Sequence, residues 1–461
     1  MATSLNVLLA LLLGSNWLSG LALAEESVQS KNETVIRRGF CIVGGGAAGT
    51  YAAIRLRELG QDVVVVEKTG RLGGQTRTYF NCLTSTAIDY GVRRFDDSPE
   101  TRKFFKHFNI PVEIDTTAND FETARYDFRT GVPVSPYPGN ATEAIGRYTE
   151  ELERYSYLSQ GWNLSEQVPE PLLEPFRDFV KQHDLGPALE TMTLLSQGMR
   201  YLLDYATVYL LKIVSLSQLR GQHLVPSRRN NSEIYYAAQQ ELGEDVILHS
   251  TVVHALRSDN KLHRLTVESD TGERVIIEAD ATVMALPPKN DEMDGFDLDS
   301  LESFFVRQFQ WGYVYTGLIS DSGLPEDTQI LNRGVDTPYR LPRYPSTYSI
   351  VSTGVAGIHL VTYGSAEEMS EEDVRDAIVD DILGLQDGGL NTTQPTFLAF
   401  ATHSPFDMSV SREAIKAGFY QDVGDLQGHR NTYWVGSAWE HPDSSAIWRS
   451  VDRLLPAIIS D

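Results

Sequence analysis

The sequence has little cysteine. Cys41 and Cys82 are the two thiols among 461 residues, which is too few for a disulfide framework or a cysteine-rich zinc site. One bridge at most could form, and Cys41 falls in a segment that reads as a buried strand, which argues against it. The ten histidines show no HExxH or similar ligand spacing, so no metal site is expected.

Positive charge is also scarce. Lys and Arg total 39 against 63 Asp and Glu, for a formal net charge of −24, and no long basic run occurs. This charge has the wrong sign for a phosphate backbone and argues against a nucleic-acid partner. An acidic surface is compatible with attraction of a cationic amine, and equally with solubility alone. The length and the 41% hydrophobic content indicate a globular chain of two to three domains.

The first 24 residues contain an apolar run that is too short to span a membrane. Residues 7–13 are apolar, and 22–24 form a small-x-small cleavage site before two glutamates. Lys and Arg are missing ahead of the apolar core, which departs from the usual signal peptide. The alternative is an uncleaved anchor, but residues 14–16 interrupt the run before the ~20 residues that span a bilayer. We expect a signal peptide over 1–24, cleaved after Ala24.

Nothing else in the sequence reads as a membrane span. Residues 205–219 are apolar but contain Lys212 and predict a buried helix, so no integral membrane segment is expected in the mature chain. Secretion, or residence in the lumen of the secretory pathway, would make the Asn-x-Ser/Thr motifs glycosylation sites. There are five such asparagines: Asn32, Asn140, Asn163, Asn230 and Asn391.

The first strand and helix carry a dinucleotide-binding fingerprint. An apolar strand over 39–43 leads directly into Gly44, Gly46 and Gly49, which open a helix, and a second apolar strand then ends at Glu67. In this βαβ pattern Gly44 makes the tight turn, Gly46 lets backbone approach a pyrophosphate, and Gly49 allows the helix to pack on the strand. Glu67 would reach the ribose hydroxyls. The pattern predicts dinucleotide binding at the start of this helix.

The next residues indicate which dinucleotide. Arg71, Gly73, Gly74, Gln75 and Thr76 belong to a stretch that resembles the RxGGRxx[ST] doublet of FAD-dependent amine oxidases and their relatives. The resemblance implies that this loop passes the pyrophosphate and ribityl part of FAD. Gln75 stands where the family usually has arginine, so an amide replaces one phosphate contact. The alternative is a glycine-rich turn without a ligand.

Later segments resemble further parts of the same family in the same order. Residues 88–91 are similar to the stretch near the flavin ring, 251–253 to the strand that meets adenine, and 432–438 to the strand before the flavin-edge helix. That helix would start near Asp443 or Ser444 as its N-cap and direct free amides at the flavin N1–C2=O edge. The family usually has Asp or Glu after the glycine of the 432–438 segment, as a carboxylate for the ribityl chain, and Ser437 stands at that position here. The resemblance adds these residues to the cofactor site: Gly91, Val252, Gly436, Ser445 and Ala446.

The fold class is therefore expected to be α/β, a Rossmann-type FAD-binding domain with a discontinuous α+β substrate-binding domain. The predicted FAD-binding segments are 35–110, 225–290 and 396–461, and the substrate domain takes 111–224 and 291–395. Within the substrate domain, the patterns predict helices at 144–158, 171–183, 188–209 and 371–383, and strands at 311–319, 347–353 and 357–363.

Chemistry at such a site belongs to the flavin, so no catalytic acid, base or nucleophile is assigned. Aromatic faces suit an amine or an indole-like ring, although core packing is the more common role of any single aromatic residue. The substrate-pocket candidates are Trp311, Tyr313, Tyr315, Phe419, Tyr420, Trp439 and His441. The attachment cysteine of some amine oxidases is missing, so we expect non-covalent FAD, with attachment through His441 as the alternative.

The tail from 418–420 through 444–448, together with the stretch 71–76, resembles exported FAD oxidoreductases of secondary metabolism, such as the β-cyclopiazonate dehydrogenase type. The resemblance implies a secreted FAD-dependent oxidoreductase that moves a hydride from a C–H next to nitrogen, in an amine or alkaloid-like metabolite, onto flavin N5. Oxygen would reoxidise the flavin. The alternatives are an FAD oxidase of an amino acid, polyamine or prenylated thioether, and a non-catalytic flavin-binding protein.

Overall fold

The computed structural model describes residues 34–82, 84–116, 121–196, 198, 201–259 and 261–460. The predicted signal peptide and Asn32 lie outside this part of the chain. Over the described residues, none of the helices combines the length and the apolar character needed to cross a bilayer. Both thiols are free, with Cys41 buried and Cys82 exposed.

One sheet is built around the glycine-rich fingerprint. Its strands run in the order β10-β2-β1-β13-β12-β11, with β20 beside β13. The central strands β2, β1, β13 and β20 are parallel, and β12 and β11 extend the sheet antiparallel. The bounds are β1 Thr34–Val43, β2 Val63–Val66, β10 Val246–Ile247, β11 Ser250–Leu256, β12 His263–Ser269, β13 Arg274–Met284 and β20 Thr432–Trp434.

Three helices accompany this sheet: α1 (Ala47–Glu58), α9 (Glu233–Leu242) and α14 (Ser444–Ile458). The helix α14 packs against α1 through Trp448, whose ring stacks on Tyr51 at 5.7 Å between centroids. The indole Nε1 of Trp448 donates to the carbonyl of Ala47 at 3.1 Å. The first turns of these two helices, far apart in sequence, are therefore held side by side.

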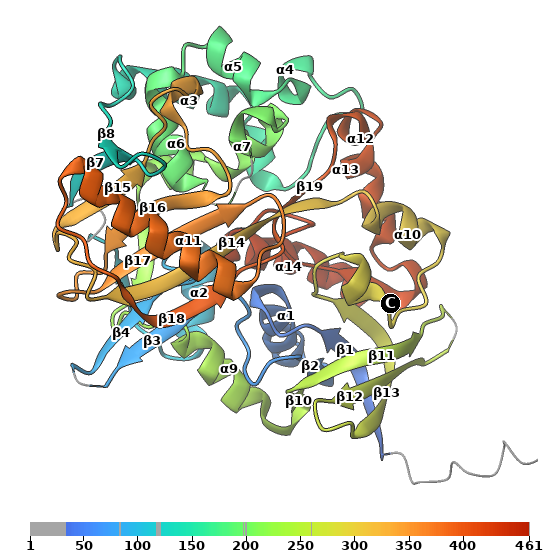
Figure 1. Ribbon diagram of the computed structural model, residues 1–461. Coiled ribbons are helices and arrows are strands. Elements are labelled where there is room, and N and C mark those ends of the chain that lie inside the picture. Colours follow the sequence, from blue (N-terminus) through green and yellow to red (C-terminus); the bar gives the residue numbers. More distant parts are fainter. Residues whose placement is uncertain are drawn as a thin grey trace, which may run out of the picture.

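A second, larger sheet has the order β18-β14-β17-β16-β15-β7-β8, with β19 paired to β14. Figure 1 shows α11 (Glu371–Gly384) lying across one face of this sheet. The bounds are β7 Glu122–Asp127, β8 Val132–Pro133, β14 Gln310–Ser320, β15 Thr328–Asn332, β16 Ser346–Ser352, β17 His359–Ser365, β18 Thr396–Thr402 and β19 Phe406–Ser409. Strands β18 and β19 belong here, so the stretch 396–409 is not part of the cofactor sheet as the sequence boundary had it.

Most of the remaining helices lie at the top and upper right of Figure 1, above the large sheet, and α10 lies lower on the right. They share one extensive buried cluster that reaches the end of β20 and the loop before α14. These helices are α3 Ala141–Arg154, α4 Glu170–Leu173, α5 Phe176–Gln182, α6 Leu189–Leu195, α7 Thr207–Ile213, α8 Leu216–Arg220, α10 Ser300–Val306, α12 Arg412–Lys416 and α13 Phe419–Asp422.

Two small sheets connect these parts. The hairpin of β3 (Thr78–Asn81) and β4 (Thr86–Asp89) follows the glycine doublet directly. The strand β9 (His223–Pro226) pairs with β5 (Phe95–Asp96) and β6 (Val112–Ile114), next to α2 (Pro99–His107).

The long helix predicted over 188–209 is wrong. The structure has α6 and α7 there as separate helices, and Gly198 between them has a φ of +100°. Glycine adopts this left-handed conformation without the steric cost that other residues incur, and it commonly ends a helix. The predicted strands at 311–319, 347–353 and 357–363 correspond to β14, β16 and β17, and the helix at 371–383 corresponds to α11.

Candidate cofactor and substrate site

The first glycine loop has the geometry that the fingerprint predicts. Gly44 has a φ of +101°, and its amide donates to the carbonyl of Val66 at 2.8 Å. A Cβ on Gly49 would lie 1.9 Å from the carbonyl oxygen of Gly44, so the helix approaches the strand more closely than any other residue allows. A Cβ on Gly46 would meet no atom within 4 Å, and α1 starts without a side-chain cap. The space at the positive end of α1 is therefore open to an anion.

Glu67 stands at the end of β2 and fastens this loop. Its Oε2 accepts from the amide of Gly45 at 2.7 Å, and its Oε1 accepts from the amide and hydroxyl of Thr69 at 2.8 and 2.7 Å. The amide of Ser250 donates to the carbonyl of Glu67 at 3.1 Å. This bond brings the start of β11, and with it Val252 two residues on, to the same end of the sheet as Glu67.

The doublet loop lies directly against the first glycine loop. The amide of Gly73 donates to the carbonyl of Gly45 at 2.8 Å, and a Cβ on Gly74 would lie 3.0 Å from the Cα of Gly46. The guanidinium of Arg71 donates to the carbonyls of Leu72 and Gly74 at 2.8 and 3.0 Å. Burial, with Arg77 nearby, lowers the pKa of Arg71. Arg71 therefore braces the doublet loop in this conformation.

Gln75 and Gly91 connect the doublet to the large sheet through a histidine that the sequence reading missed. The amide nitrogen of Gln75 donates to the carbonyl of His403 at 3.0 Å. A Cβ on Gly91 would lie 2.0 Å from the carbonyl oxygen of Gln75 and 3.1 Å from Cε1 of His403. The His403 ring bonds the Thr316 hydroxyl at 2.8 Å, and burial, reinforced by Arg77, lowers the pKa of His403 to about 4. His403 is therefore neutral at physiological pH.

The start of α14 forms the other side of the site. Asp443 caps the helix, because its Oδ1 accepts from the amide of Ala446 at 2.8 Å. The fully buried Ser445 hydroxyl accepts from the amide of Asp96 at 3.0 Å. Gly436, which ends the preceding strand, has a φ of +121°, and a Cβ there would lie 3.8 Å from Cβ of Ala48 on α1. The Ala446 amide and Ser445 hydroxyl thus have partners within the protein.

Two observations test whether these residues fit a dinucleotide. The space beside Gly46 is open. The buried hydroxyl of Thr76, in the doublet loop, has no hydrogen-bond partner in the described part of the chain. An open phosphate cradle and an orphaned hydroxyl fit an extended anionic cofactor such as FAD.

Two of the substrate-pocket candidates, Tyr313 and Tyr315, lie on the face of the large sheet that α11 covers. Successive side chains of a strand point to opposite faces. Tyr315 packs in the cluster beneath α11, its hydroxyl donates to the carbonyl of Met369 at 3.0 Å, and Tyr313 packs against the same cluster. The opposite face of β14 carries Thr316, which contacts His403. Tyr315 and Tyr313 therefore pack toward α11 and away from His403, and their place in a substrate pocket stays a prediction.

The remaining aromatic candidates lie in the helical cluster. Tyr420 stacks on Trp162 with centroids 3.6 Å apart, and Phe419 is buried beside it. The rings of Trp439 and Phe309 pack with their centroids 5.3 Å apart. The indole Nε1 of Trp439 is buried with no hydrogen-bond partner among the described residues. The ring nitrogen of Trp311 donates to the hydroxyl of Tyr313 at 3.1 Å. Phe419 and Tyr420 are core residues, whereas Trp439 and Trp311 are only partly buried.

His441 lies in a dry environment close to α14. Burial lowers its pKa to about 4, and the nearby Lys212 adds to this lowering. The histidine is therefore uncharged at physiological pH. No contact of His441 bears on covalent attachment, which stays a prediction.

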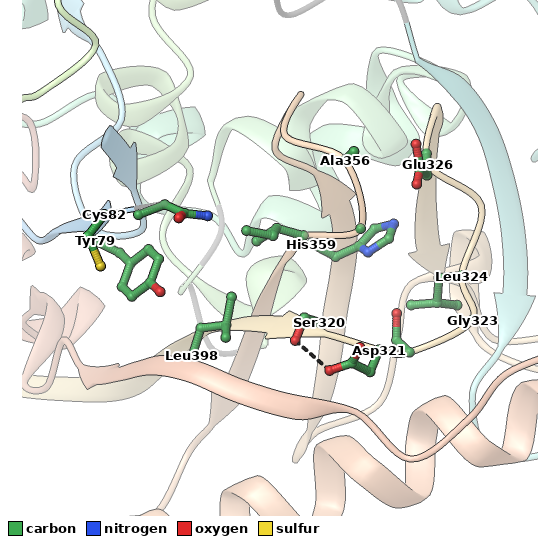
Figure 2. Close-up of a pocket in the computed structure, with 14 residues that line it drawn as sticks. Tyr79, Cys82, Ser320, Asp321, Gly323, Leu324, Glu326, Ala356, His359 and Leu398 are labelled. Atoms are coloured by element: carbon green, nitrogen blue, oxygen red, sulfur yellow. Dashed lines mark hydrogen bonds between the residues drawn. The ribbon is translucent and has the colours of Figure 1, made fainter. Parts of the chain in front are cut away.

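A separate hollow of about 520 Å³ lies beside the β3–β4 hairpin (Figure 2). Tyr79 and Cys82 of the hairpin, the loop after β14 and His359 line it, and Ser320 donates to Asp321 at its rim. Its described lining contains none of the predicted cofactor or substrate residues. This hollow is distinct from the glycine loops.

Four of the five predicted glycosylation asparagines lie in the described part of the chain. Asn140, Asn163 and Asn391 are exposed, whereas Asn230 is half-buried. Asn140 also caps α3 through its Oδ1, which accepts from two backbone amides of the first turn.

Comparison with known proteins places this geometry in a family. Residues 42–108 match the model for an NAD(P)-binding Rossmann-like domain. The FAD-dependent oxidoreductase dbaF of Emericella nidulans is 34% identical over 450 residues, covering 95% of each chain. Beta-cyclopiazonate dehydrogenase of Aspergillus oryzae is 29% identical over 461 residues, covering 98% of this chain and 99% of the other. The chain belongs to the FAD-dependent oxidoreductases, and FAD is its cofactor.

Solved structures agree on the fold. A fatty acid isomerase from P. acnes superposes with a TM-score of 0.73 at 16% identity, covering 94% of this chain and 100% of the other. A triple mutant of putrescine oxidase gives a TM-score of 0.66 at 12% identity, covering 92% and 99%. The predicted resemblance to amine oxidases and to the β-cyclopiazonate dehydrogenase type, the fold class, the cofactor and the enzyme class are thereby confirmed.

Proposed function

We propose that this enzyme removes a hydride from a C–H next to nitrogen in an amine or alkaloid-like secondary metabolite, with oxygen as the final electron acceptor. When bound, FAD supplies the hydride acceptor. The residues that would hold it are the two glycine loops with Glu67 and Val252 at one end, and Gly91 with the start of α14 at the other.

The observation that carries the proposal is the poor solvation of the buried region between the doublet loop and the large sheet. Burial lowers the pKa of His403, which contacts both the doublet loop and β14, to about 4, so a charged group is poorly solvated there. The same environment would disfavour an ammonium ion and leave an amine neutral. A neutral nitrogen has the lone pair that supports hydride loss from the adjacent carbon.

The protein's part in this reaction is to orient the substrate and exclude water. Neutral His403, fixed by Thr316 and by the Gln75 contact, presents no charge that would have to be desolvated. The amide dipoles in the first turn of α14 would stabilise negative charge on a cofactor bound beside it.

Anaerobic reduction tests the proposal. The purified holoprotein is mixed with a panel of primary, secondary and cyclic amines without oxygen, and flavin absorbance is followed. Bleaching by one class, followed by hydrogen peroxide on admission of air, is the expected result. A flavin that chemical reductants bleach but no member of the panel does would contradict the proposed substrate class.

We also propose that the chain enters the secretory pathway, with residues 1–24 as its signal peptide and FAD held non-covalently. The exposed positions of Asn140, Asn163 and Asn391 support glycosylation. Expression of the full chain in a eukaryotic host should yield a mature N-terminus at Glu25 and a mass that falls on treatment with an N-glycosidase. Retention of residues 1–24, or a mass that the glycosidase leaves unchanged, would contradict this.

A further inference from the structure

Two adjacent arginines, Arg93 and Arg94, have no role in the fingerprint. Among the residues that the structure describes, neither guanidinium makes a hydrogen bond or an ion pair. The nearest acidic influences are Asp115 on both arginines and Asp96 on Arg94. Asp115 is already paired with Arg229 at 2.9 Å, and Asp96 accepts from Gln218 at 2.9 Å. The positive charge of the two arginines is therefore not matched by a dedicated partner.

The position of the arginines follows from contacts on either side of them. Gly91 packs against the carbonyl of Gln75 in the doublet loop, and the carbonyl of Val92 accepts from the Asn231 side chain at 2.8 Å. Three residues after Arg93, the amide of Asp96 donates to Ser445 in the first turn of α14 at 3.0 Å. The two arginines therefore lie on the short stretch between the doublet loop and α14, at the flavin end of the expected cofactor site.

Arg93 differs from a surface arginine in one respect. It has a large accessible area, yet burial lowers its pKa, and the adjacent Arg94 lowers it further. Its guanidinium is therefore accessible to a ligand but poorly solvated. An unpaired charge in such a place is costly unless a ligand supplies the opposite charge. A guanidinium presents a planar fork of donors that matches the two oxygens of a carboxylate or a similar delocalised anion.

We propose that Arg93 binds an anionic oxygen group, a carboxylate or an enolate, on the substrate that is oxidised at the flavin. Arg94 adds positive potential from the neighbouring position. This inference rests on the proposed function and narrows it: the substrate carries an acidic group as well as the reacting C–H. A simple diamine would be repelled by two arginines, so the acidic outer surface is not what selects the substrate.

Binding of three small ligands with one ring and different charge tests this assignment. Indole-3-acetate, indole-3-acetamide and tryptamine are titrated into the purified holoprotein, and the change in flavin absorbance gives each dissociation constant. We expect indole-3-acetate to bind more tightly than the neutral amide and the cation. In Arg93→Gln, the dissociation constant for indole-3-acetate should rise at least about tenfold, while that of the amide changes little.

Two further variants serve as a charge-matched control and as a conservative substitution. Arg264→Gln makes the same change in charge on an exposed strand of the cofactor sheet and should leave all three affinities unchanged. Arg93→Lys keeps the charge but loses the fork, so it should weaken indole-3-acetate less than Arg93→Gln does. It also serves as the test variant if Arg93→Gln fails to fold.

Several results would overturn the assignment. One is an Arg93→Gln protein, or Arg93→Lys where that variant stands in, that binds indole-3-acetate as the parent does. Others are a parent that prefers tryptamine, or one that indole-3-acetate does not perturb. An Arg93→Gln protein that folds but purifies without flavin, while Arg264→Gln keeps it, would assign Arg93 to the cofactor instead. The readout is binding rather than turnover, so failure of amine oxidation would leave this result standing.

Discussion

Lys212 on α7 and Glu440, just ahead of α14, form a buried ion pair, with Nζ and Oε1 2.9 Å apart and the side chains 2% and 5% exposed. The ammonium also donates to the carbonyls of Leu158 and Gly161, each at 3.1 Å, and Arg453 contacts the other carboxylate oxygen at 2.7 Å. This network fastens the helical cap of the large sheet to the loop that carries Trp439 and His441. The helical cap and the cofactor sheet are therefore joined beside the predicted flavin edge.

Replacing one partner of this ion pair should lower the free energy of unfolding more than replacing both partners together. Glu440→Gln leaves a buried ammonium without its counter-ion and should lower the free energy of unfolding by about 3 kcal/mol. Lys212→Met should cost less, because Glu440 keeps Arg453. The double variant should be more stable than the sum of the single losses predicts. Chemical denaturation of the four proteins measures this, and strict additivity would show that the two residues are not coupled.

Two alanine substitutions in the first glycine loop should separate folding from cofactor binding. Gly49→Ala places a Cβ 1.9 Å from the carbonyl oxygen of Gly44, so it should destabilise the fold by about 3 kcal/mol or abolish soluble expression. Gly46→Ala meets no protein atom within 4 Å, so the variant should fold normally but fill space needed by the diphosphate.

Thermal unfolding of the cofactor-free proteins and their flavin content are the two measurements. A Gly46→Ala protein with full flavin content and unchanged FAD affinity would contradict the placement of the diphosphate beside α1.

The cap of α14 offers a second matched pair of variants. Asp443→Ala removes the side-chain oxygen that accepts from the amide of Ala446 and should cost about 1 kcal/mol of stability. Asn is an equally good N-cap, so Asp443→Asn should keep most of that stability. Equal losses in Asp443→Ala and Asp443→Asn would show that the carboxylate charge, rather than the capping bond, matters at this position.

The pH dependence of stability should contain a contribution from Asp89. Burial raises its pKa from 3.8 to about 7, while hydrogen bonds from Thr78 and Asn231 oppose the rise. The folded state therefore binds the proton more tightly than the unfolded chain, and this contribution to stability is present below pH 4 and lost as pH rises toward 7. The loss is at most about 4 kcal/mol.

Asp89→Asn removes the titration while its Oδ1 can still accept both hydrogen bonds. Melting temperatures measured from pH 4 to pH 8 should fall less steeply for Asp89→Asn than for the parent, with the curves diverging above pH 5. Parallel curves would contradict the raised pKa.

The cofactor loops were predictable because their information is local. Turn geometry at Gly44 and close packing at Gly49 follow from residues a few positions apart, and Glu67 follows from the length of one helix and strand. The pocket was less predictable. The alternation of β14 identifies two faces, but only the position of α11 shows that Tyr315 lies on the outer one.

The role of His403 could not be predicted, because it depends on Gln75 and Thr316, which lie far away along the chain. Arg93 and Arg94 did leave a signal in the sequence, because two adjacent arginines follow the flavin-like segment 88–91 in a predominantly acidic chain.

FAD binding by the glycine loops is tested most directly by the absorbance spectrum of the purified protein before and after acid precipitation. We predict flavin bands in the native protein that move to the supernatant after precipitation, as expected for non-covalent FAD held by the two glycine loops. Bands that stay with the precipitate would show covalent attachment and would direct attention to His441. A colourless protein that remains colourless after incubation with FAD would contradict FAD binding by the two glycine loops.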